Sequence, residues 1–296
     1  MKTRQSIDAK QHRLDRDFLE SSMVGNIQRI KDLLEAGADI HVQDDHATRC
    51  AAQRGDAEVV LLLLDRGAGI HAENDCALRW ASHNGHLEVA RILINRDANI
   101  HAENDYTLRC SAEYGHTELV RILLDRGADI HAKSGYALRF ASLNGHTEVV
   151  RLLLVGGADI DSERALCVAS FHGHSEVVRL LLDRGADIHV QNDYALRWAA
   201  GNGHVEVVQL LLDRGADLHA ESSSALRKSV ANGHSDVAIL LVALDADLEV
   251  GIETAKEQLA QGVLDMLNQV KRSREEKDTL SEEVPVPGRA DHRIRM

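Results

Sequence analysis

The residues best suited to chemistry in this chain are its 17 histidines, most of which fall in two regular series. One series is His86, His116, His146, His174, His204 and His234, and the other is His41, His71, His101, His131, His189 and His219. Zinc needs three or four ligands about 2.0–2.1 Å from one point. Residues that return once per helical layer lie on a line with a spacing of about 8–10 Å. We therefore predict histidines that bond the backbone or solvent, and no metal site; a pH response is the alternative.

Arginines form a third regular series. It consists of Arg49, Arg79, Arg109, Arg139, Arg197 and Arg227. A guanidinium presents a fork of donors that suits carboxylates. We predict that each arginine ties a connecting loop together by pairing with a loop carboxylate such as Asp75, Asp105 or Asp193. The alternative is a stripe that binds anions, nucleic acid or a small molecule.

No combination of residues predicts catalysis. The four cysteines, Cys50, Cys76, Cys110 and Cys167, form no Cys-x-x-Cys pair, and free thiols in a reducing compartment are expected. The sequence holds no glycine-rich phosphate loop and no His-Glu-x-x-His motif. We expect a protein that is not an enzyme and that uses no cofactor.

All these series belong to one repeating unit. Its clearest marker is GADIH at 37–41, which returns seven times in variant form, with six steps of 30 residues and one of 28. A fixed period of this size is typical of a solenoid. In the copy at 193–222, the spacing of apolar residues predicts helices over about Ala195–Asn202 and Val205–Arg214. The second is apolar around most of its circumference, so it must be buried between neighbouring copies.

The recurring pattern L-x-x-A-[AS]-x-x-G-H-x-E-V-V-x-L-L-L-x-x-G-A-D resembles the ankyrin repeat. It covers the chain from about Phe18 to Asp247. The resemblance implies an all-α solenoid of stacked helix-turn-helix units joined by β-hairpin-like loops. It also implies a binding scaffold without catalysis, with its partner on the concave face of first helices and loop tips.

Two departures from the family pattern concern the loops. The unit has 30 residues where the family has 33, and Tyr194-Ala195-Leu196-Arg197 stands where the family has Thr-Pro-Leu-His. Short connecting loops are therefore expected. This style resembles repeats of large DNA viruses of amoebae and of some fungi.

The repeat also predicts the domain boundaries. We expect an extension over 1–13, a solenoid over 14–272 and a disordered tail over 273–296. The solenoid would comprise a cap unit at 14–44, seven units at 45–252 and a helical cap at 253–272. An apolar stripe within Ile252–Val270 would cover the edge of the last unit. The 28-residue step predicts a notch in the row of loops around Asp161, Ser162 and Glu163.

Composition narrows the class of partner. The formal net charge of −13 argues against nucleic acid, which needs a basic face, and favours a basic protein partner. The longest apolar run, Val237–Leu244, falls short of the ~20 residues of a membrane span. We expect a monomer in the cytoplasm, which would be the host cytoplasm if the chain is viral.

Partner-binding residues are expected where the repeats differ from one another on the first helix. The candidates are Trp80, His83, Asn84, Tyr114, Phe140, Leu143, Asn144, Phe171, His172, Trp198 and Asn202. Aromatic side chains tend to dominate binding energy, although the larger rings could instead fill gaps between helices. The predicted function is a protein-interaction scaffold. An adaptor for a ubiquitin ligase is an alternative, but residues 252–296 show no recruiting motif.

Overall fold

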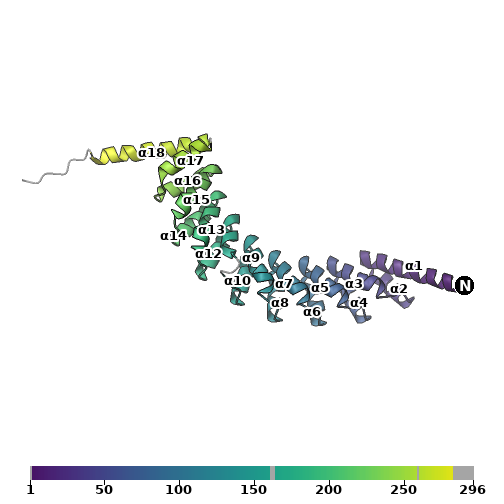
Figure 1. The fold of residues 1–296 in the computed structure, drawn as a ribbon. Coiled ribbons are helices and arrows are strands. Elements are labelled where there is room, and N and C mark those ends of the chain that lie inside the picture. Colours follow the sequence, from purple (N-terminus) through teal and green to yellow (C-terminus); the bar gives the residue numbers. More distant parts are fainter. Residues whose placement is uncertain (1, 161–163, 259, 283–296) are drawn as a thin grey trace, which may run out of the picture. The chain divides into compact units, whose positions relative to one another are not determined.

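The computed structural model describes residues 2–160, 164–258 and 260–282, and within these ranges it contains eighteen α-helices and no strand (Figure 1). The predicted all-α class is confirmed. The chain forms two compact units. Unit 1 comprises Met1–Ala169 and Glu176–Ala186, and unit 2 comprises Ser170–Ser175 and Asp187–Met296.

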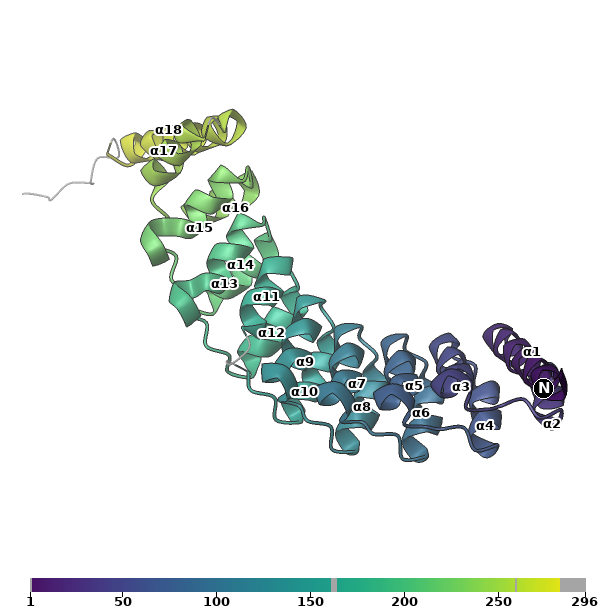
Figure 2. The same ribbon diagram turned by 45° about the vertical axis from the view of Figure 1, so that its right-hand side comes forward.

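In unit 1 the helices form two rows (Figure 2). The first helices of successive repeats pack side by side, and so do the second helices. The helices are α1 (Lys2–Val24), α2 (Ile27–Glu35), α3 (Val42–Arg54), α4 (Ala57–Asp65), α5 (Ala72–His83), α6 (Leu87–Asn95), α7 (Ala102–Glu113), α8 (Thr117–Asp125), α9 (Ala132–Leu143) and α10 (Thr147–Val155). The boundary between the units falls within the pair α11 (Ala165–His172) and α12 (Ser175–Asp183).

Unit 2 repeats the arrangement. Its helices are α13 (Val190–Gly201), α14 (Val205–Asp213), α15 (Ala220–Ala231), α16 (Ser235–Ala243), α17 (Leu248–Glu257) and α18 (Gln261–Glu282). Helix α17 packs on α15, and α18 packs on α16. The last helix pair therefore continues both rows, with Ile252 and Leu267 buried.

The core consists of the same positions in every repeat. Leu78, Leu108 and Leu138 of the first helices are fully or almost fully buried. Val60 and Leu63 of α4 are fully buried too. Burial of such a side chain contributes about 1.5–3 kcal/mol. Because one helix pair is too small to enclose these residues, stacking of neighbouring repeats creates the core.

The turn between the two helices of a repeat requires glycine. Gly85 has φ +73°, a conformation that other residues adopt only with strain. A Cβ atom there would lie 2.5 Å from Cε1 of His116 in the next repeat. The glycine therefore permits both the turn and the close approach of the imidazole from the following layer.

The loops that join repeats differ from the β-hairpin-like form that the resemblance implied. Glu73, Asn74 and Asp75 have φ of 48°, 56° and 55°, so three successive residues are left-handed. The same turn recurs at 43–45, 103–105, 133–135, 191–193 and 221–223. This conformation costs about 1–2 kcal/mol per residue. Asn and Asp tolerate it better than most residues do, and the side-chain bonds described below offset the cost.

Both ends of the described part of the chain are more helical than the sequence indicated. Helix α1 begins at Lys2, so residues 2–13 are helical and continuous with the first repeat, and the predicted extension over 1–13 stays a prediction as a domain boundary. Gln11 Nε2 donates to the Gly37 carbonyl oxygen over 3.0 Å, which fixes α1 against the first loop. Helix α18 continues to Glu282, ten residues past the predicted boundary at 272, since residues such as Arg274 and Lys277 favour helix.

Some predictions fall on residues that the structure does not describe. The notch around Asp161, Ser162 and Glu163 and the tail over 283–296 lie outside the described ranges. The division into cap unit, seven units and helical cap stays a prediction. No helix in the described ranges is long and apolar enough to cross a membrane.

Candidate functional site

The arginine series closes the left-handed loops. Arg79 donates from Nε to the Asn74 carbonyl oxygen over 3.0 Å and from Nη2 to the Glu73 carbonyl oxygen over 2.8 Å. The corresponding pairs of bonds recur at Arg49, Arg109 and Arg197. The prediction that arginine ties the loop is confirmed. The three named aspartates are not the partners, because the left-handed turn points two carbonyl groups at the guanidinium; a loop carboxylate is found at Arg49, whose Nη1 lies 3.4 Å from Glu73 Oε2.

The loop aspartates bind elsewhere. Asp75 is buried, and its Oδ1 accepts from the backbone N–H of Asn99, in the next loop, over 2.8 Å. The same oxygen lies 2.9 Å from Nδ1 of His71. Asp45, Asp105 and Asp193 make the equivalent pair of contacts. Four histidines of this series, His41, His71, His101 and His189, therefore link successive loops through aspartate.

The second histidine series bonds the backbone of the preceding repeat. Nε2 of His86 lies 3.0 Å from the Gln53 carbonyl oxygen, and Nε2 of His146 lies 3.0 Å from that of Glu113. The prediction of backbone-bonded histidines is confirmed at these positions. Among the described residues, no three His, Cys, Asp or Glu side chains are placed to hold a metal ion.

The four cysteines, all within the described residues, form no disulfide. Burial raises the pKa of Cys110 to about 12 and also raises the pKa of Cys50. A thiol with a raised pKa is a poor nucleophile at neutral pH. These two cysteines therefore belong to the helix packing.

An exposed row of rings lies on the first helices α5 and α7 of unit 1. Trp80 is 40% exposed and Tyr114 is 47% exposed. His83 lies between them, with ring centroids 5.8 Å from Trp80 and 4.7 Å from Tyr114, both edge-to-face. His83 Nδ1 is buried and has no hydrogen-bond partner among the described residues. The sequence named all three residues, and the structure brings them together.

The predicted asparagines have a structural role. Asn84 Nδ2 donates to the Gln53 carbonyl oxygen and Asn144 Nδ2 to that of Glu113, each over 2.9 Å. Both bonds reach the preceding repeat. Asn202 Nδ2 instead donates to the backbone carbonyl oxygen of Trp198, in the same repeat, over 2.8 Å. These amides position the turn.

Phe140 packs on its own helix. Its ring stacks on Tyr136 with centroids 3.9 Å apart. The Tyr136 hydroxyl donates to Glu113 Oε2 over 2.8 Å. Burial, together with this bond to a carboxylate, raises the pKa of Tyr136 to about 12. Phe140 and its neighbour Leu143 are half-buried, so they offer less free surface than Trp80.

The candidate residues of unit 2 form a denser cluster. Trp198 lies 4.8 Å from Phe171 and 5.3 Å from Tyr194, measured between ring centroids, and the Lys228 ammonium lies 4.6 Å from its ring. Its indole Nε1 is buried and has no hydrogen-bond partner among the described residues. Burial, and to a lesser extent the nearby His174 and His204, lower the pKa of the exposed His172. Trp198 thus contacts side chains of the preceding and following repeats as well as its own.

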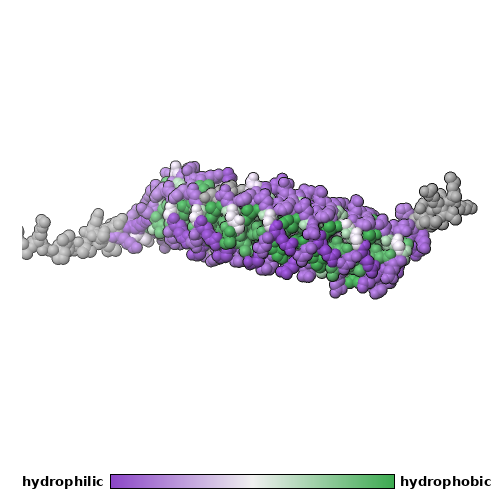
Figure 3. All heavy atoms as spheres, turned by 90° about the horizontal axis from the view of Figure 1, so that it is seen from below, coloured by the Kyte–Doolittle hydropathy of each residue, from purple (hydrophilic) through white to green (hydrophobic). Residues whose placement is uncertain are grey.

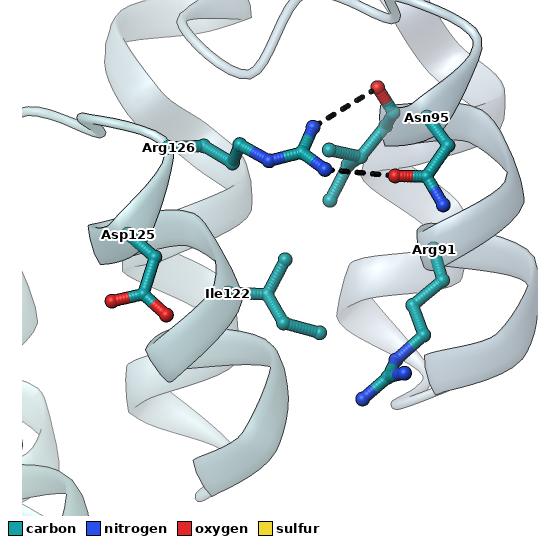
Figure 4. A pocket seen from close by; sticks show the side chains of 6 residues that line it. Arg91, Asn95, Ile122, Asp125 and Arg126 are labelled. Atoms are coloured by element: carbon teal, nitrogen blue, oxygen red, sulfur yellow. Dashed lines mark hydrogen bonds between the residues drawn. The ribbon is translucent and has the colours of Figure 1, made fainter.

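The opposite side of unit 1 is formed by the second helices. Figure 3 views the molecule from below, the side on which Figure 1 places α4, α6, α8 and α10, and shows green patches among purple atoms. Leu61 and Val155 are its most exposed large apolar side chains, at 41% and 72%. A shallow pocket lies between α6 and α8, where Arg126 Nη2 donates to Asn95 Oδ1 over 2.8 Å (Figure 4). This face offers aliphatic and charged groups but no aromatic ring.

Sequence reasoning missed one feature of the first-helix face. A cavity of about 370 Å³ is lined by Arg49, Glu73, Cys76, Arg79, Trp80 and Tyr106. The sequence could have indicated this cavity, because the small side chain of Cys76 stands where the next two repeats have Tyr106 and Tyr136. The exposed row and this cavity share Trp80.

Comparison with known families supports the repeat pattern. A family model described as "Ankyrin repeats (3 copies)" matches residues 19–104, 49–134, 108–192 and 166–251. These overlapping matches extend over most of the chain. A search of curated proteins found no match. The resemblance that the sequence indicated is therefore confirmed.

Proposed function

Because the chain belongs to the ankyrin-repeat family, whose members generally mediate protein–protein interactions, we propose that it binds a partner protein on the first-helix face of unit 1. Trp80, His83 and Tyr114 form the centre of this surface. The observation that carries the proposal is the exposure of Trp80 and Tyr114, at 40% and 47%. Partly exposed aromatic side chains that are already held in place lose little entropy on binding and often anchor an interface.

The surroundings of the row suit a partner surface. Phe140 and Leu143 extend it along α9, and Asn84 and Asn144 lie at its edge. The side-chain amides of Asn84 and Asn144 each donate one hydrogen bond to a backbone carbonyl oxygen of the chain, which keeps the edge rigid. A rigid edge around exposed rings favours binding without rearrangement.

The charge of the loop tips favours a basic partner. Asp44, Glu73 and Glu103 are exposed at the tips of successive loops. The neighbouring arginines donate to loop carbonyl groups, so the Nε–Nη2 edge of each guanidinium is occupied by the protein itself. The same bonding disfavours the alternative of an anion-binding stripe. We place the interaction in the cytoplasm, where thiols such as Cys50 stay reduced.

Unit 2 carries a smaller candidate surface of its own. His172 is exposed, whereas Phe171, Trp198 and Asn202 are half-buried. We assign these residues mainly to the packing of unit 2, with His172 as the accessible contact. The main interface is assigned to unit 1.

Affinity capture from cell extract with quantitative mass spectrometry tests the proposal. We expect a Trp80→Ala/Tyr114→Ala double variant to lose at least ten-fold of the specific partner signal, since two anchors of about 1–2 kcal/mol each correspond to that loss. Leu61→Ala/Val155→Ala is the matched control, because it removes exposed apolar side chains from the second-helix face. Identical partner profiles for wild type and the aromatic variant would end the assignment.

A further inference from the structure

Guanidinium groups and aromatic rings alternate along the first helices of unit 1. Arg79 Cζ lies 5.9 Å from the centroid of the Tyr106 ring, and Arg109 Cζ lies 5.6 Å from the same centroid. Arg109 Cζ also lies 5.2 Å from the ring of Tyr136, and Arg139 Cζ lies 5.8 Å from it. These distances are in the range of cation–π contacts. A tyrosine thus fills the space between each of these pairs of arginines.

One ring is missing from this series. The 30-residue step places Cys76 at the position of Tyr106 and Tyr136, so this position supplies no ring between Arg49 and Arg79. The cavity of about 370 Å³ lies at this point, within the range of small ligand pockets. Cys76 is buried, and Trp80 on the same cavity is 40% exposed. We call this cavity the Cys76 pocket.

The bonding of the two arginines decides what the Cys76 pocket can accept. Arg49 donates to the carbonyl oxygens of Gln43 and Asp44 and lies 3.4 Å from a Glu73 carboxylate oxygen. Arg79 donates to two loop carbonyl oxygens from Nε and Nη2. The Nε–Nη2 edge of both guanidinium groups is therefore occupied, and the Glu73 carboxylate beside Arg49 disfavours an anion. A guanidinium whose edge is occupied still offers its flat face, and that face binds aromatic rings.

We infer that the Cys76 pocket binds an aromatic side chain of the partner, a tyrosine, in the place that the chain's own tyrosines occupy in the next two repeats. The inference rests on the proposed function, because Trp80 belongs to both surfaces. The incoming ring lies between Arg49 and Arg79 and beside the indole of Trp80. Aromatic pairs and cation–π contacts then both stabilise the bound ring.

A single-tryptophan variant tests the pocket directly. The chain has two tryptophans, so Trp198→Phe leaves Trp80 as the reporter. We expect N-acetyl-tyrosinamide to change Trp80 fluorescence saturably, with a dissociation constant on the order of 1 mM. N-acetyl-leucinamide should give no saturable change. Absence of a saturable change with the tyrosine probe would overturn the inference.

A second variant fills the pocket. In the same background, Cys76→Tyr supplies the missing ring, and we expect it to abolish the response and raise the melting temperature by about 2–4 °C. Ser224→Tyr is the control, because it places tyrosine at the equivalent repeat position in unit 2 and should leave the response intact. A Cys76→Tyr protein that still responds contradicts the assignment. Cys76→Leu, which also fills the pocket, serves if the tyrosine variant does not fold.

Partner capture separates this inference from the proposed function. Loss of the partner in Cys76→Tyr, with its fold intact, supports insertion of a partner tyrosine. A Cys76→Tyr protein that loses the probe response but keeps the partner refutes that insertion and leaves the proposed function standing. Retention of the partner by Trp80→Ala/Tyr114→Ala refutes the proposed function instead.

Discussion

Trp80 of unit 1 and Trp198 of unit 2 occupy the same position of the repeat but have different surroundings. Trp80 is 40% exposed, and its edge-to-face contact with His83 leads on to Tyr114. Trp198 is half-buried among Phe171, Tyr194 and Lys228. The backbone position is shared, so the neighbouring side chains alone determine whether the indole packs or is displayed.

One of the differing neighbours lies one helical turn before the tryptophan. Tyr194 precedes Trp198 by four residues, and its ring contacts the indole. Cys76 precedes Trp80 by four residues and has no ring to offer. The change of residue type at this position opens a cavity beside Trp80, and Gln53 and Cys110, which stand where unit 2 has Phe171 and Lys228, also leave its indole less covered. Variation of this kind lets one scaffold present different surfaces.

The largest expected effect is the loss of folding stability when each tryptophan is replaced by alanine. Truncation of a buried Trp costs about 3–5 kcal/mol, and for the half-buried Trp198 we expect Trp198→Ala to cost about 2–3 kcal/mol. Trp80→Ala should cost less than about 1 kcal/mol, as for exposed positions generally. Urea unfolding followed by circular dichroism measures both free energies of unfolding. Equal losses of unfolding free energy in the two variants would show that the two indoles do not differ in how much they contribute to packing.

A subtler variant sharpens the same contrast. Trp198 Nε1 is buried and has no hydrogen-bond partner among the described residues, and an unsatisfied donor costs about 1–3 kcal/mol. Trp198→Phe removes that donor and keeps a ring, so we expect a free energy of unfolding within about 1 kcal/mol of wild type. The same urea experiment measures this free energy. A large loss of stability in Trp198→Phe would show that the indole N–H makes a stabilising hydrogen bond.

The smallest expected effect is the titration of Tyr136 in unit 1. Its folded pKa of about 12 exceeds the ordinary value of 10.0 because of burial and the bond to Glu113. The stabilisation is therefore complete below about pH 10 and is lost as the pH rises through about 12. Ultraviolet absorbance of wild type minus Tyr136→Phe should show a phenolate transition near pH 12, and Glu113→Gln should lower its midpoint. A transition near pH 10 would show that neither burial nor Glu113 perturbs this phenol, and an unchanged midpoint in Glu113→Gln would show that the two groups do not interact.

The sequence predicts the repeat and much of the site, for identifiable reasons. The strict spacing of Leu78, Leu108 and Leu138 specifies the stack, and the variable positions identify Trp80 and Tyr114. The left-handed loop was not predictable, since no glycine requires it at Glu73 or Asn74. Guanidinium bonding to carbonyl groups followed from that loop geometry and was therefore missed as well. The resemblance to the ankyrin repeat implied β-hairpin-like loops, whereas the described loops form left-handed turns.

Photo-crosslinking at two positions of similar exposure tests the central claim most directly. A benzophenone side chain replaces Tyr114 on the first-helix face or Leu61 on the second-helix face, which are 47% and 41% exposed. The account predicts a partner crosslinked from position 114 and none from position 61, with the crosslink removed by excess unlabelled wild-type protein. A partner crosslinked from position 61 alone would contradict it and move the interface to the second helices.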